Sequence, residues 1–138
     1  MDKEFIFSFL RENPVFHLAN VHNGKPYVRA LLLYDADDKG IIFHTSKSKD
    51  LYKQLTVNPD VEICFINEAK NMQIRISGAV EFIEDETFKK EIVEKRKLLQ
   101  PWILHHGLKM LAIMRLTNGL AQVWEPELTF LPKRYVRL

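Results

Sequence analysis

The chain has 138 residues, which suits one domain over residues 1–138, and its 46% hydrophobic and 28% charged composition is that of an ordinary globular protein. Its 20 lysines and arginines nearly balance 18 acidic residues, so the net charge of +2 gives no electrostatic reason to expect a nucleic-acid partner. One cysteine excludes a disulfide framework, and no apolar run suits a signal peptide or a membrane span. We therefore expect a cytoplasmic protein without membrane attachment.

The pattern of apolar residues predicts short strands with three helices among them. In chain order we expect a helix at 2–12, strands at 15–22, 26–34 and 41–45, a helix at 48–57, strands at 61–67 and 72–83, a helix at 86–99, and strands at 109–116 and 120–124. Asn23-Gly24 predicts a hairpin between the first two strands, a polar turn is expected at 35–40, and a bend at 117–119 interrupts the last strand. The pattern predicts no clear secondary structure for residues 100–108, and it predicts an irregular tail for residues 125–138.

The short links between most of these strands favour antiparallel pairing over a doubly wound parallel sheet. The expected fold class is mainly β: a small antiparallel β-barrel of about six strands, with flanking helices at its edges.

The strongest functional signal lies in residues 41–65, where an apolar strand leads into a polar loop and then a helix. The loop brings Thr45, Ser46 and Lys49 to the helix start, where free backbone N–H groups and the helix dipole favour a phosphate. Lys53 lies one turn after Lys49 on the same face, so two ammonium groups are available to neutralise a phosphate dianion. The alternative is a polar turn in which Ser46 or Ser48 merely caps the helix.

Two isolated side chains add weaker signals. Arg29 is the one cation in the otherwise apolar strand 28–34, although an arginine at a strand start often faces solvent. Trp124, at a strand end, has the flat surface to cover a ring, although it would equally well plug the end of the barrel. The five histidines are scattered without ligand spacing, so no metal site is expected.

On these residues the chain resembles the pyridoxamine 5'-phosphate oxidase-like FMN-binding split-barrel family. The resemblance covers roughly residues 15–124 and rests on five segments: Val28-Arg29-Ala30-Leu31-Leu32-Leu33, Phe43-His44-Thr45, Asn58-Pro59-Asp60-Val61, Gln73, and Ser77-Gly78 with Glu81. It implies a six-stranded antiparallel split β-barrel, FMN as cofactor, and a homodimer with FMN at the subunit interface.

The resemblance also implies which residues hold the flavin. The segment Arg29, Ala30, Leu31 and Leu32 would lie along it, His44 and Thr45 would contact it, the helix start would bind its phosphate, and Gln73 would reach it from the next long strand. At that helix start, Ser46, Lys49 and Lys53 are the candidates that this chain itself offers for the phosphate. Trp124 joins this set by its position, as a candidate to cover the flavin of a partner subunit.

The chain departs from the oxidase pattern at the helix start, where Asp50 and Leu51 stand in place of an Arg-Lys pair. Tyr34 replaces a lysine at the end of the arginine strand, and residues 86–108 lack the oxidase's Tyr-Arg-Ser set for the substrate phosphate. These departures favour flavin binding without vitamin B6 oxidation.

The expected function is therefore that of an FMN-binding flavoprotein, an FMN-dependent oxidoreductase acting on an unidentified small molecule. Flavin chemistry needs no acid–base triad from the protein, so the absence of one does not argue against an enzyme. Two alternatives stay open: a flavin-binding carrier or sensor without turnover, and a split barrel that binds haem or a deazaflavin.

Overall fold

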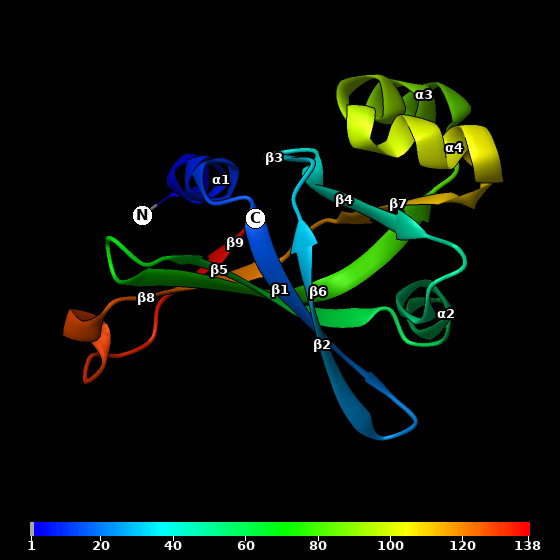
Figure 1. The fold of residues 1–138 in the computed structure, drawn as a ribbon. Coiled ribbons are helices and arrows are strands. Elements are labelled where there is room, and N and C mark those ends of the chain that lie inside the picture. The colour runs from blue at the N-terminus through cyan, green and yellow to red at the C-terminus, as the bar shows by residue number, and fades with distance from the viewer. Residues whose placement is uncertain (1) are drawn as a thin grey trace.

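The computed structural model describes residues 2–138, and its strands form an antiparallel sheet with helices at the edges (Figure 1). The elements, in chain order, are α1 (Lys3–Glu12), β1 (Val15–His22), β2 (Lys25–Leu32), β3 (Asp35–Asp37), β4 (Gly40–Ser46), α2 (Asp50–Val57), β5 (Asp60–Asn67), β6 (Met72–Ile83), α3 (Glu86–Lys95), η1 (Lys97–Leu99), α4 (Gln100–His106), η2 (Leu108–Met110), β7 (Leu111–Leu116), β8 (Leu120–Trp124), η3 (Pro126–Leu128) and β9 (Tyr135–Arg137). The expected mainly β class is confirmed.

The described residues contain nine strands where about six were expected. The unexpected strands are the three-residue β3 and β9, which lie in the expected turn and tail, whereas β7 and β8 are the strands expected at 109–116 and 120–124, counted separately on either side of the bend at 117–119. The six-stranded count was therefore only approximate, because pairs this short leave little trace in the pattern of apolar residues.

The sheet order is β2-β1-β5-β6-β7-β4-β3, and β8 pairs with β6 and β9. Strand β6 is the longest and joins the two halves of the sheet. Its residues 72–79 pair with β5, and residues 73–77 also pair with β8 on the other edge. Its residues 80–83 instead pair with β7. One continuous strand therefore belongs to both halves of the split barrel (Figure 1).

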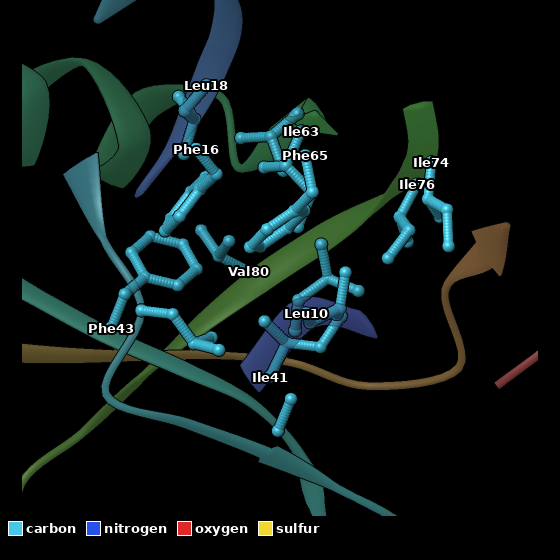
Figure 2. Packing of buried hydrophobic residues seen from close by; sticks show 14 of the residues in the cluster. Leu10, Phe16, Leu18, Ile41, Phe43, Ile63, Phe65, Ile74, Ile76 and Val80 are labelled. Atoms are coloured by element: carbon cyan, nitrogen blue, oxygen red, sulfur yellow. The ribbon is translucent and has the colours of Figure 1, made fainter. Parts of the chain in front are cut away.

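The main core fills the space between these halves and is closed by α1. Phe16 packs on Phe65 with ring centroids 4.8 Å apart and meets Phe43 edge-on at 5.2 Å (Figure 2). Helix α1 buries Ile6 and Leu10 in the same cluster, and Asp2 caps the helix by accepting a hydrogen bond from the Phe5 N–H. The expected helix at the N-terminal end is thus confirmed.

Helices α3 and α4 lie over β4 and β7 and enclose a smaller core around Ile42, Ile92 and Ile113 (Figure 1). The Asp85 carboxylate caps α3, as expected, but the helix ends at Lys95 and not near 99. Arg96 leaves the helical conformation and donates a hydrogen bond to the Leu33 carbonyl. None of the helices within residues 2–138 is both long enough and apolar enough to cross a membrane.

Candidate functional site

A solvent-accessible pocket of about 440 Å³ lies where the end of β2, the end of β4 and the start of α2 meet. Its lining residues come from two chain segments: Arg29, Ala30, Leu31, Thr45, Ser48, Lys49, Asp50 and Leu51. The structure therefore gathers the arginine strand and the polar loop, which are 14 or more residues apart in the chain, around one space.

Strand alternation explains how β2 contributes to the pocket. Arg29 and Leu31 are half-buried on the side of the core, whereas Val28 and Leu32 are exposed on the opposite face. Leu32, which was expected along the flavin, is not among the lining residues, and its side chain is 46% exposed. The alternative of a solvent-facing Arg29 does not hold within this chain.

The loop before α2 is held by hydrogen bonds among its own residues. The hydroxyl oxygens of Ser46 and Ser48 lie 2.7 Å apart, and the Ser48 N–H donates to Ser46 Oγ at 3.2 Å. Lys49 is the N-cap residue of α2, and no side chain among the described residues caps this helix. The simple capping role considered for Ser46 or Ser48 is therefore wrong, and the helix start keeps backbone donors for a ligand.

Thr45 lines the pocket and carries a buried hydroxyl group. The residue is 6% exposed, and its Oγ1 has no hydrogen-bond partner among residues 2–138. A buried hydroxyl without a partner lowers stability by roughly 1–3 kcal/mol. Because Thr45 lines the pocket, a bound ligand could supply the missing partner.

The cations near the pocket differ in their surroundings. Lys49 lines the pocket, whereas Lys53 is exposed on α2 and lies outside the lining. Among the described residues, Arg29, Lys49 and Lys53 form no ion pair with a carboxylate. Lys47 differs from them, because Glu84 pairs with it at 2.7 Å. The pocket therefore carries unneutralised positive charge from Arg29 and Lys49, with Asp50 as its one acidic lining residue.

His44 lies beside Thr45 on β4 but is not a lining residue. Its Nε2 is buried without a hydrogen-bond partner among residues 2–138. Burial lowers the pKa of His44 from 6.5 to about 4, and the positive charges of Arg96 and Lys49 act in the same direction. His44 is therefore neutral at physiological pH.

Gln73 and Trp124 form a second group, away from the pocket. They stand directly opposite each other in the β6–β8 pair, on the face opposite the buried Ile74. Strands β1 and β5 separate β6 from β2 in the sheet. Within one chain the structure thus brings together only part of the expected cofactor site, namely Arg29 to Leu31, Thr45 and Lys49.

Two polar residues behind the pocket were missed by sequence reasoning. Asn20 is 3% exposed on β1 and Gln54 is 6% exposed on α2, and both contact the Arg29 guanidinium. The sequence did contain a signal for the burial of Asn20, because this residue follows Phe16 and Leu18 at every second position of β1, on the buried face of the strand. Asp50 and Ser48 also line the pocket without having been expected there.

Comparison with known proteins identifies the family. A family model described as pyridoxamine 5'-phosphate oxidase matches residues 2–119. The chain belongs to the pyridoxamine 5'-phosphate oxidase family. This confirms the resemblance to that family, and the five segments on which the resemblance rests all lie within the matched residues.

Individual members of the family show how far the likeness extends. A pyridoxine/pyridoxamine 5'-phosphate oxidase of Blochmanniella pennsylvanica is 36% identical over 76 residues, which make up 54% of this chain and 35% of that oxidase. The matched segment therefore spans about a third of the oxidase's length.

Solved structures agree in fold. A NimC/NimA family protein from Clostridium acetobutylicum superposes with a TM-score of 0.80 at 23% identity, over 98% of this chain and 92% of that one. A pyridoxamine 5'-phosphate oxidase-related, FMN-binding protein from Nostoc punctiforme gives 0.64 at 17% identity, over 96% and 88%. A FAD-binding protein from Mesorhizobium loti gives 0.65 at 15% identity, over 91% and 96%.

Proposed function

We propose that this family member binds a flavin nucleotide, FMN, and acts as an FMN-dependent oxidoreductase on a small molecule. The observation that carries the proposal is the pocket, in which Arg29 and Lys49 are unneutralised, Thr45 Oγ1 has no partner, and the start of α2 has no side-chain cap. Each of these features suits an anionic, phosphate-bearing ligand. Family membership and the flavin-binding relatives indicate that the ligand is a flavin.

Different residues of the pocket would contact the phosphate of the ligand through different groups. Arg29 and Lys49 would hold the phosphate by charge-assisted hydrogen bonds, with Thr45 Oγ1 and the backbone N–H groups at the start of α2 completing its coordination. When bound, FMN supplies the two-electron chemistry of its isoalloxazine ring. Neutral His44, directly next to Thr45 in the chain, would add no charge near it.

The proposal includes a homodimer, because the outer face of β2, β1 and β5 exposes large apolar side chains. They are Val15, Val21, Val28, Leu32 and Ile66, with exposures from 44% to 67%. Exposed apolar patches of this kind mark interfaces in soluble proteins, and a two-fold contact is self-complementary. Gln73 and Trp124 point to the same face of the sheet, so both would lie in the contact with a second copy packed there.

Oxidation of pyridoxamine 5'-phosphate itself is not proposed. Asp50 and Leu51 line the pocket where the oxidase pattern has an Arg-Lys pair, and Tyr34 occupies the place of the oxidase lysine. The Tyr34 hydroxyl instead donates a hydrogen bond to Glu91 at 3.1 Å. We therefore expect the substrate to be a different small molecule.

An absorbance spectrum of the purified protein, before and after addition of FMN, tests the cofactor. A flavin band that is retained on gel filtration supports the proposal. A haem or deazaflavin spectrum, or no retention of added FMN, would overturn it. NAD(P)H consumption with candidate acceptors then separates an enzyme from a carrier or sensor, which would hold FMN without turnover. FAD and riboflavin titrations show which flavin fits best.

A further inference from the structure

The Arg29 side chain is held from behind the pocket by two neutral amides. Its Nη1 donates to Asn20 Oδ1 at 3.1 Å, and its Nη2 donates to Gln54 Oε1 at 3.2 Å. The two amides are themselves joined, because Asn20 Nδ2 donates to Gln54 Oε1 at 2.9 Å. The guanidinium also lies over the Tyr27 ring, with 5.4 Å between Cζ and the ring centroid. Three elements, β1, β2 and α2, therefore fix this one cation.

Burial makes this arrangement rigid. Asn20 and Gln54 are each under 7% exposed, so both amides would be destabilised without hydrogen-bond partners. Gln54 shares its helix face with the core residues Leu51 and Leu55, which ties the amide to the packing of α2. The guanidinium is thereby oriented before any ligand arrives, which reduces the entropy lost on binding.

The neutrality of the two amides is the unusual feature. An arginine held inside a protein is commonly paired with a carboxylate, which orients it but also cancels its charge. Here the amide oxygens accept two N–H bonds without contributing a negative charge, and no carboxylate among residues 2–138 pairs with Arg29. Asp50 lines the same pocket but forms no ion pair with Arg29, so the guanidinium charge remains available to a ligand.

We infer that Asn20 and Gln54 are positioning residues that present the Arg29 guanidinium, oriented but unneutralised, to the phosphate of the pocket's ligand. The inference rests on the proposed function for the identity of that ligand, and it assigns a role to two residues behind the pocket. It requires that adding a carboxylate at either amide position should lower affinity for the phosphate while keeping the hydrogen bond to Arg29.

The decisive variant is Gln54→Glu, which changes the charge and hardly the shape. We expect its dissociation constant for FMN, measured by fluorescence titration, to rise about tenfold or more, because a charge-assisted contact to the phosphate is weakened. The constant for riboflavin, which has no phosphate, should stay within about twofold. Thr56→Glu is the matched control, because it adds the same charge on the exposed side of α2 and should leave both constants nearly unchanged.

Further variants keep the inference testable if Gln54→Glu does not fold. Asn20→Asp places the same charge on the other side of Arg29 and should give the same selective loss of FMN. Gln54→Met removes the hydrogen bond without adding charge and should weaken FMN binding more than riboflavin binding. An unchanged ratio of FMN to riboflavin affinity in the folded variants would overturn the inference and leave flavin binding itself intact.

Failure of the proposed function has a different signature. If the wild-type protein binds neither FMN nor riboflavin, the flavin assignment is wrong, and inorganic phosphate then becomes the probe. Weaker phosphate binding in Gln54→Glu than in the wild type and Thr56→Glu, followed by NMR titration, would support the role of the two amides. Equal phosphate binding in all three proteins, or none in the wild type, would overturn it.

Discussion

Glu84 and Lys89 form an ion pair of 2.8 Å in which the lysine side chain is only 6% exposed. The same carboxylate also binds Lys47 at 2.7 Å and so ties the loop before α2 to the turn between β6 and α3. Hydrogen bonds from Lys47 and Lys89 lower the pKa of Glu84 below its usual 4.5. The Lys89 ammonium depends on this one carboxylate for its charge compensation among the described residues.

We therefore expect Glu84→Gln to lower the free energy of unfolding at pH 7 by roughly 1–3 kcal/mol, mainly through Lys89. A carboxyl whose pKa is lowered by folding stabilises above its unfolded pKa, and this contribution is lost as the pH falls through the folded value. The difference between wild type and variant in urea denaturation should shrink below pH 4.5. A difference that stayed constant down to pH 3 would contradict this account.

The lowered pKa of His44 predicts a second pH effect, which begins at a higher pH than that of Glu84. The pKa of His44 is about 4 in the folded protein and 6.5 when exposed, so the unfolded chain binds the extra proton first as the pH falls. Stability should be fully present above pH 6.5 and decline toward pH 4, by up to about 3 kcal/mol. His44→Phe should abolish this decline in thermal denaturation between pH 7 and 4.5. If the variant kept the wild-type slope in that range, another group would be responsible.

Lys49 and Lys53 were both expected to anchor the phosphate, but only Lys49 lines the pocket. Lys49→Ala should weaken FMN binding about tenfold or more, since charge-assisted hydrogen bonds contribute roughly 1.5–3 kcal/mol. Riboflavin binding should change little, and Lys53→Ala serves as the matched control with a smaller effect on FMN. Equal losses for FMN and riboflavin in Lys49→Ala would show that this lysine does not recognise the phosphate.

The substitution Thr45→Val should change the stability of the apoprotein and its affinity for FMN in opposite directions. The substitution removes a buried hydroxyl that has no partner in the chain, so the apoprotein should become more stable, by about 1 kcal/mol. The same change should weaken FMN binding, because the ligand loses a hydrogen-bond partner. Thermal denaturation of the apoprotein and FMN titration measure the two effects. A less stable apoprotein would show that Oγ1 is satisfied by water.

Trp124 provides a test of a site shared between two copies. Trp124→Ala should raise the fluorescence of bound FMN and weaken binding by about 1 kcal/mol if this ring covers the flavin of the partner. Mixing Lys49→Ala with Trp124→Ala should restore intact sites in mixed dimers, up to roughly a quarter of all sites if subunits exchange at random. No recovery on mixing, or a monomer of 16.3 kDa in light scattering, would contradict the shared site.

Local patterns predicted much of the fold, since strand alternation and Asn23-Gly24 gave β1 its observed bounds and β2 its bounds to within two residues. Strand β3 was not predicted from the sequence, because aspartates such as Asp35 and Asp37 have a low propensity for strands. Its pairing with β4 depends on the tertiary structure. Helix α4 has no clear periodicity, although Pro101 in its first turn and Gly107 at its end were usable signals.

The candidate site was predicted only in part from the sequence, because its residues come from segments that are far apart in the chain. The residues of the loop from Thr45 to Lys49 follow one another in the sequence, so its position before a helix was enough to predict a phosphate-binding role. The separation of Gln73 from Arg29 depends on sheet order, which puts β1 and β5 between them, and no local pattern encodes that order. Gln54 was missed because a polar residue on a helix is normally assigned to the surface.

The turn at Asn23-Gly24 has an effect well beyond its own position. Both residues have positive φ, 52° and 74°, as a two-residue type I′ turn requires, and this turn sets which residues of β1 and β2 face each other. An insertion of one residue there would shift the register by one and turn every β2 side chain to the other face of the sheet. Val28 or Ala30 would then stand beside Asn20, and the guanidinium would point to the outer surface. The direction in which Arg29 points thus depends on a tight turn at the far end of the hairpin as well as on the residue itself.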